Sequence, residues 1–114
     1  MDRKHLLAYI RRFLTAVGAD EGYLFGSRAR GDYLESSDVD LMIISDGFRD
    51  ISFPRRLVHV HQYWDLPYFL EALPYTHDEA RRLRSTSGVV AEALRAGIRV
   101  LPMRRRSAKA NREM

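Results

Sequence analysis

The segment that most constrains the fold of this chain is Asp38–Ser45, DVDLMIIS. It alternates polar and apolar residues at its start and becomes fully apolar over Leu41–Ile44, which is typical of a central β-strand. Strand side chains alternate between faces, so Asp38 and Asp40 project from the same face, about 6–7 Å apart. Such a carboxylate pair is costly without a cation, and oxygen ligands suit Mg²⁺. The segment therefore predicts a buried strand that carries a metal-binding carboxylate pair.

A second motif, Gly26-Ser27, follows a short apolar strand predicted over 23–25 and opens a helical turn predicted over 28–33. We expect Ser27 to be the N-cap of that turn. Glycine lets a phosphate approach the backbone, and a helix N-terminus offers unpaired N–H groups. Each motif is weak by itself, because most Gly-Ser pairs are turns and most Asp-x-Asp pairs are solvated strand ends. Together, ten residues apart and flanked by strands, they predict a phosphate cradle that faces the carboxylate pair.

The remaining periodicity predicts one small domain, since 114 residues suffice for a single core. It predicts helices over 2–17, 54–64, 77–86 and 89–96, strands over 68–73 and 98–101, and a loop over 47–53. Thr76, with Glu79 three residues later, is the expected N-cap of the helix over 77–86. The order of elements predicts an α/β (α+β) fold, a small mixed sheet flanked by helices.

Composition excludes several classes of function. The chain has no cysteine, which rules out disulfides, thiolate catalysis and cysteine-bound zinc. No apolar run approaches the roughly 20 residues of a membrane span, and no signal peptide is evident, so we expect a cytoplasmic protein. The net charge of +4 is concentrated after residue 103. We expect one folded domain over 1–103 and a flexible basic tail over 104–114, the one part suited to nucleic acid.

The pattern Gly-Ser, ten residues, Asp-x-Asp resembles the signature of the nucleotidyltransferase superfamily that includes DNA polymerase β. The longer stretch GSRARGDYLESSDVDLMI, residues 26–43, resembles its smallest members, the minimal nucleotidyltransferases. The resemblance extends over residues 22–97. It implies the polymerase β-like nucleotidyltransferase fold, with ATP as the substrate and two Mg²⁺ ions.

Members of that family carry a third carboxylate on a following strand. The stretch LEALPYTHDEARRL resembles the strand and helix start that hold it, which places the acid at Glu71. The family usually has aspartate there, and glutamate is one methylene longer. Asp65, at the junction before the strand, is the alternative.

The resemblance implies a role for each residue of the predicted site. Asp38 and Asp40 would hold both metals, and Glu71 would complete the metal nearer the attacking hydroxyl and take its proton. Gly26 and Ser27 would hold the β- and γ-phosphates.

Two arginines follow the phosphate turn and are candidates to neutralise the triphosphate. Arg28 is one step into the helical turn and is favoured to face the phosphates. Arg30 is the second candidate, with pairing to Asp32 or another acid as its structural alternative.

The resemblance also implies a partner, because minimal nucleotidyltransferases are often encoded beside a small helical HEPN protein. The leading hypothesis is an antitoxin that transfers AMP to a tyrosine of a HEPN toxin. The alternatives are a catalytically silent binding antitoxin, or a small-molecule transferase of the aminoglycoside type with a homodimer completing its pocket. The intact motif disfavours the first alternative, and the lack of a second domain disfavours the other.

Apolar and aromatic side chains between residues 48 and 69 exceed what one helix face requires. They are Phe48, Ile51, Phe53, Tyr63, Trp64 and Tyr68. We expect some of them to be exposed beside the cleft and to form a docking surface.

Overall fold

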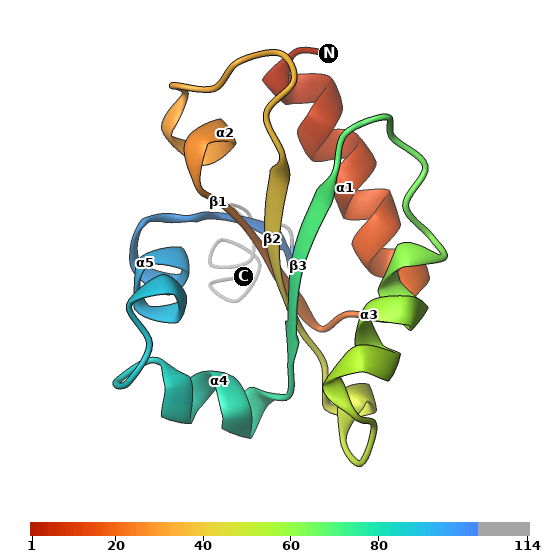
Figure 1. Ribbon diagram of the computed structural model, residues 1–114, viewed down its shortest axis with the longest axis vertical. Coiled ribbons are helices and arrows are strands. Elements are labelled where there is room, and N and C mark those ends of the chain that lie inside the picture. The colour runs from red at the N-terminus through yellow and green to blue at the C-terminus, as the bar shows by residue number, and fades with distance from the viewer. Residues whose placement is uncertain (103–114) are drawn as a thin grey trace, which may run out of the picture.

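The computed structural model describes residues 1–102 and contains one four-stranded mixed sheet (Figure 1). Its strands are β1 Glu21–Phe25, β2 Val39–Ile44, β3 Leu70–Tyr75 and β4 Ile98–Leu101. They lie in the order β3-β2-β1-β4. β2 pairs antiparallel with β1 and parallel with β3, while β1 and β4 are antiparallel. The predicted small mixed sheet is confirmed, with β2 in its interior.

Helices cover both faces of this sheet. They are α1 Arg3–Val17, α2 Ser27–Arg30, α3 Phe53–His61, α4 His77–Leu83 and α5 Gly88–Ala96, with a 3-10 turn, η1, over Asp46–Phe48. Figure 1 shows α1 and α3 on one side of the strands and α4 and α5 on the other. No helix in residues 1–102 is long and apolar enough to cross a membrane.

The side chains of β2 divide the core between these two layers. Leu41 and Ile43 belong to the larger apolar cluster, which α1 completes, whereas Met42 and Ile44 belong to a smaller cluster with α4 and α5. Because strand side chains alternate, Asp40 lies on the same face as Met42 and Ile44. The apolar cluster beneath α4 and α5 is the smaller of the two, and Asp40 lies near the start of β2 on that side of the sheet.

Local sequence signals account for most element boundaries. Asp2 caps α1 by accepting from the His5 N–H, and Gly18 ends that helix in the left-handed conformation. Thr76 and Glu79 form the predicted capping box of α4.

The third strand differs from its prediction, because it runs two residues further and includes Pro74. β3 is an edge strand, and the Ser45 N–H bonds the Tyr75 carbonyl on its inner side. The backbone nitrogen of Pro74 therefore points away from β2, toward the free edge of the sheet. The ladder needs no N–H donor at that edge. Smaller differences are η1 inside the predicted loop and later or earlier starts of two strands, β3 at Leu70 and β1 at Glu21. Three helices end earlier than predicted: α2 at Arg30, α3 at His61 and α4 at Leu83. The predicted tail over 104–114 lies outside the described residues.

Candidate active site

The turn between β1 and α2 brings the two sequence motifs into contact. Phe25 pairs with Asp40 across the β1–β2 ladder, and Gly26 follows with a φ of +74°, a conformation that favours glycine. A Cβ atom at Gly26 would lie 2.2 Å from the Asp40 Oδ2 atom. A side chain at position 26 would therefore collide with the carboxylate. Glycine is required here by backbone conformation and by close approach.

Gly26, and not Ser27 as predicted, is the N-cap of α2. The Gly26 carbonyl accepts from the N–H groups of Ala29 and Arg30, so the first helical residue is Ser27. The serine side chain had suggested a start one residue later. The Ser27 hydroxyl makes no hydrogen bond within the described residues and is available to an incoming group. With four residues, α2 has a negligible dipole, so a phosphate would depend on the individual donors of the turn.

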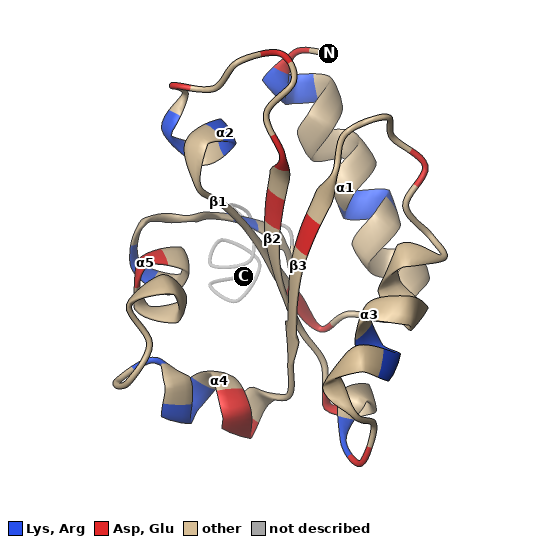
Figure 2. Cartoon of the chain, in the orientation of Figure 1, with Lys and Arg blue, Asp and Glu red and all other residues tan. Residues whose placement is uncertain are grey.

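Three carboxylates line one cleft beside this turn. Asp40 and Glu71 are register partners on the parallel strands β2 and β3, and Asp38 precedes Asp40 by two residues. All three line a cleft of about 590 Å³, and Figure 2 shows red acidic stretches side by side on β2 and β3. Asp65 lies in the loop before β3, where its N–H donates to the Tyr9 hydroxyl, and it does not line the cleft. The structure thus brings Glu71, and not Asp65, to the aspartate pair.

The three carboxylates repel one another because they carry like charges in one cleft. None of the three forms an ion pair within residues 1–102. Partial burial, followed by the charges of Glu71 and Asp38, raises the pKa of Asp40 from 3.8 to about 6, while Arg30 acts in the opposite direction. A cation bound at this end of the sheet would relieve that repulsion.

The donor set fits magnesium better than the alternatives, because every candidate ligand is a carboxylate oxygen. Within the described part of the chain, no three His, Cys, Asp or Glu side chains converge closely enough to hold a metal by themselves. Mg²⁺ commonly takes one or two carboxylates and completes its shell with water and substrate phosphates. An incomplete carboxylate set beside a phosphate turn is consistent with that mode of binding.

Arg28 does not have its predicted place, whereas Arg30 forms the pair with Asp32 that was its structural alternative. Arg28 is 1% exposed, and its guanidinium donates to the carbonyls of Ser37 and Glu35 instead of facing the cleft. Arg30 has a side chain that is 58% exposed and pairs with Asp32 at 3.3 Å. Arg30 does not line the cleft, but its charge lowers the pKa of Asp40. The prediction for Arg28 assumed that the side chain one step into α2 points outward, whereas α2 is packed on its loop.

The rest of the cleft lining is mostly apolar and was not predicted from the sequence. The residues that line the cleft together with the carboxylates are Phe25, Leu73, Tyr75, Ser87, Val89 and Val90. Glu71, Leu73 and Tyr75 alternate along β3, so the period of two residues in a strand would have placed the last two beside Glu71. The α5 residues carry no such signal, because their position depends on how α5 folds back over the sheet.

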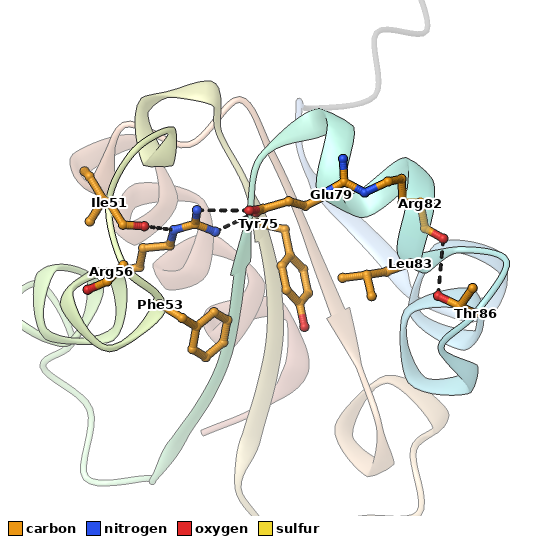
Figure 3. Close-up of a pocket in the computed structure, with 9 residues that line it drawn as sticks. Ile51, Phe53, Arg56, Tyr75, Glu79, Arg82, Leu83 and Thr86 are labelled. Carbon is orange, nitrogen blue, oxygen red and sulfur yellow. Dashed lines mark hydrogen bonds and ion pairs between the residues drawn. The ribbon is translucent and has the colours of Figure 1, made fainter.

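A second hollow of about 620 Å³ adjoins the cleft, since Tyr75 lines both. Figure 3 shows the Tyr75 ring between Phe53 and Leu83, and the Phe53 and Tyr75 ring centroids are 5.9 Å apart. The Arg56 guanidinium spans its rim, donating to the Pro74 carbonyl and, at 2.6 Å, to Glu79 Oε1. The hydrogen bonds from Arg56 hold the pKa of Glu79 near 2. This hollow is thus bordered by a paired acid, unlike the carboxylate cleft.

A glycine turn lies against Asp40, and Asp40 and Glu71 are partners on adjacent strands, an arrangement that suits a phosphate-bearing substrate and a bound cation. The family described as nucleotidyltransferase domain matches residues 8–113, and the chain belongs to that family. The chain is accordingly a transferase domain for nucleotidyl groups.

One solved structure agrees with this assignment. A protein from Sulfolobus solfataricus, named a "putative nucleotidyltransferase", superposes with a TM-score of 0.56 at 26% identity, over 68% of this chain and 73% of its own. A second structure of the same description has a TM-score of 0.45 at 26% identity, over 70% of this chain and 88% of its own. No curated protein matches the chain. The predicted fold class is confirmed.

Proposed function

We propose that this chain transfers AMP from ATP to a hydroxyl group in a magnesium-dependent reaction, and that the acceptor is a tyrosine of a HEPN toxin, which makes the chain an antitoxin. The observation that carries the transfer reaction is the contact between Gly26 and Asp40, with Glu71 beside Asp40 on the next strand. A glycine turn in contact with a cleft lined by three carboxylates supports this reaction. The HEPN acceptor is supported by resemblance to minimal nucleotidyltransferases.

The geometry assigns each group a part in an in-line displacement. The donors of the Gly26–Ser27 turn bind the β- and γ-phosphates and orient the α-phosphorus toward β3. Asp38 and Asp40 hold Mg²⁺, which when bound neutralises the carboxylates and polarises the phosphate oxygens. Arg30, whose charge lowers the pKa of Asp40, stabilises negative charge on those oxygens.

Glu71 is placed to act on the acceptor. It lies on β3, with β2 between it and the phosphate turn. Its carboxylate takes the proton of the hydroxyl as the hydroxyl oxygen bonds to the α-phosphorus. The bond from the α-phosphorus to the bridging oxygen breaks, and pyrophosphate leaves with that electron pair. The products are an AMP ester of the acceptor and pyrophosphate.

An apolar surface beside the cleft supports a protein acceptor. Of the six side chains expected to form it, Phe48 is buried, Trp64 and Tyr68 pack partly buried against the core, and Ile51, Phe53 and Tyr63 are exposed. Ile51 and Phe53 line the hollow that adjoins the cleft through Tyr75, and Val89 on the cleft wall is 53% exposed. Exposed apolar side chains grouped around a site are typical of a protein interface.

The test is to incubate the protein with ATP labelled at the α-phosphate, Mg²⁺ and the purified product of the neighbouring gene, which on this proposal is a HEPN protein. The expected result is label on a HEPN tyrosine and no label with Gly26→Ala, whose Cβ collides with Asp40. Tight binding without label would instead establish a silent binding antitoxin. Label on an aminoglycoside, and none on the HEPN protein, would establish the small-molecule transferase.

A further inference from the structure

We propose that Arg28 is a positioning residue that holds the phosphate turn and the two carboxylate-bearing strands in register. It follows Ser27 directly, yet its side chain is among the largest fully buried ones in the described residues, with 1% exposure. Its contacts reach the segments that lead into β2 and β3. One side chain thus joins the three pieces of chain that supply the site.

The first connection fixes the approach to Asp38. Arg28 Nε donates to the Ser37 carbonyl at 3.1 Å, and Nη2 donates to the Glu35 carbonyl at 2.9 Å. Ser37 immediately precedes Asp38, so the first bond fixes the peptide unit from which the Asp38 side chain departs. The rigid fork of a guanidinium makes both bonds at once, which a lysine ammonium on a single stem cannot reproduce.

The second connection reaches β3. The Arg28 guanidinium carbon lies 4.7 Å from the Tyr33 ring centroid and 4.4 Å from that of Tyr68, and both rings contact the cation. Tyr68 stands three residues before Glu71, and its hydroxyl donates to Glu35 Oε1 at 3.2 Å. The Arg28–Tyr68 contact therefore ties the entrance of the strand that carries Glu71 to the loop that carries Asp38.

The burial of Arg28 requires a compensating role, because an unpaired buried cation is destabilising. No carboxylate pairs with Arg28 in residues 1–102, and its Nη1 atom has no hydrogen-bond partner there. Its charge faces aromatic rings and carbonyls, whereas Arg30 is the cation that acts on Asp40. Arg28 therefore acts on the reaction through the loop it holds, by geometry and not by charge at the phosphates.

Arg28→Lys separates these two roles, since it keeps the charge and loses the fork, and Arg28→Met removes both. The control is Arg56→Lys, which alters a buried arginine that also donates to a carbonyl, but far from Asp38. Two readouts apply to each full-length variant: amide hydrogen exchange over residues 34–39, and calorimetric titration with Mn²⁺ alone. The Mn²⁺ titration rests on the proposed function, whereas the exchange measurement does not.

Both Arg28 variants are expected to exchange at least about tenfold faster over 34–39 and to bind Mn²⁺ about 10–100-fold more weakly, the usual effect of losing a group that orients a metal ligand. Arg56→Lys is expected to lower Tm and leave both readouts as in the wild type. Arg28→Lys with wild-type exchange, or with faster exchange and unchanged Mn²⁺ affinity, would overturn the proposal. A wild type that binds neither Mn²⁺ nor ATP would defeat the proposed function instead, and the exchange result alone would then decide whether Arg28 holds the loop.

Discussion

Two acidic regions of this molecule have opposite electrostatic environments. Glu79 at the start of α4 accepts two hydrogen bonds from Arg56, and its pKa falls to about 2. Asp40 on β2 is partly buried beside Glu71 and Asp38 without a paired cation among the described residues, and its pKa rises to about 6. The first region joins α3 to α4, whereas the second lines a cleft.

The two carboxylates therefore differ in role: the charge of Glu79 stabilises the fold, whereas the charge of Asp40 is suited to bind a cation. Each shift corresponds to a free energy on the order of 2 kcal/mol once solvent screening is allowed for. That energy favours the folded state at Glu79 and opposes it at Asp40. A chain that keeps an unfavourable carboxylate cluster at the end of its buried strand is suited to bind a cation there.

The largest expected effect comes from Asp40→Asn, which removes the repulsion together with the metal ligand. We expect nucleotidyl transfer to fall at least about 1,000-fold and the free energy of unfolding to rise by about 1 kcal/mol at pH 7. Activity assays and thermal unfolding of the same samples measure both. Turnover at the wild-type rate, or a lower Tm, would contradict the assignment.

Glu71→Gln tests the third carboxylate, and Asp65→Asn is its matched control. Loss of a general base typically slows a reaction by about 100-fold or more, so we expect that loss for Glu71→Gln. Asp65 is exposed and outside the cleft, and its replacement is expected to leave the rate within about twofold. The reverse ranking in a steady-state assay would mean that the acceptor side of the site lies elsewhere.

The sequence predicts the carboxylate cleft around Asp40 better than it predicts the Glu79–Arg56 pair. Asp38, Asp40 and the glycine turn are found from spacing and strand alternation, because the motif is continuous in the sequence. Pairing of Arg56 with Glu79 joins residues 23 positions apart, and no local pattern signals it.

Tertiary packing overrides the usual structural preference of the residue type at two positions where the prediction is wrong. Proline normally ends a strand, yet Pro74 lies inside β3 because that edge needs no donor from it. Arginine is normally exposed, yet Arg28 is buried because two tyrosine rings and two carbonyls surround its guanidinium.

Glu79→Gln tests the paired region, with Glu92→Gln on the exposed face of α5 as its control. The substitution leaves the buried Arg56 without a countercharge, so we expect a loss of about 2 kcal/mol, roughly 30-fold in the folding equilibrium. The pKa of Glu79 is lower in the folded state than its ordinary value of 4.5, so its contribution is present above that pH. It is lost as pH falls toward 2. Urea unfolding at pH 7 and pH 3 checks both statements, and an equal difference between wild type and variant at the two values would contradict them.

The smallest expected effect is the pH dependence of metal binding, which depends on the difference between the two regions. Asp40 must lose its proton to bind Mg²⁺, and its pKa is about 6. Affinity should therefore be constant above about pH 7 and fall roughly tenfold per pH unit below 6. The Glu79–Arg56 pair stays ionised at pH 5, because the pKa of Glu79 is about 2, so the fold persists while the cleft gains a proton.

The stability of the metal-free protein should change in the opposite direction to its Mg²⁺ affinity. Because the pKa of Asp40 is higher in the folded state than its ordinary value of 3.8, protonation of Asp40 should stabilise the metal-free protein as pH falls from 7 toward 4. Calorimetric Mg²⁺ titrations between pH 5 and 8, with unfolding curves at each pH, measure both trends. A midpoint near pH 4 would mean that neither burial nor the neighbouring carboxylates raise the pKa of Asp40, and the contrast with Glu79 would disappear.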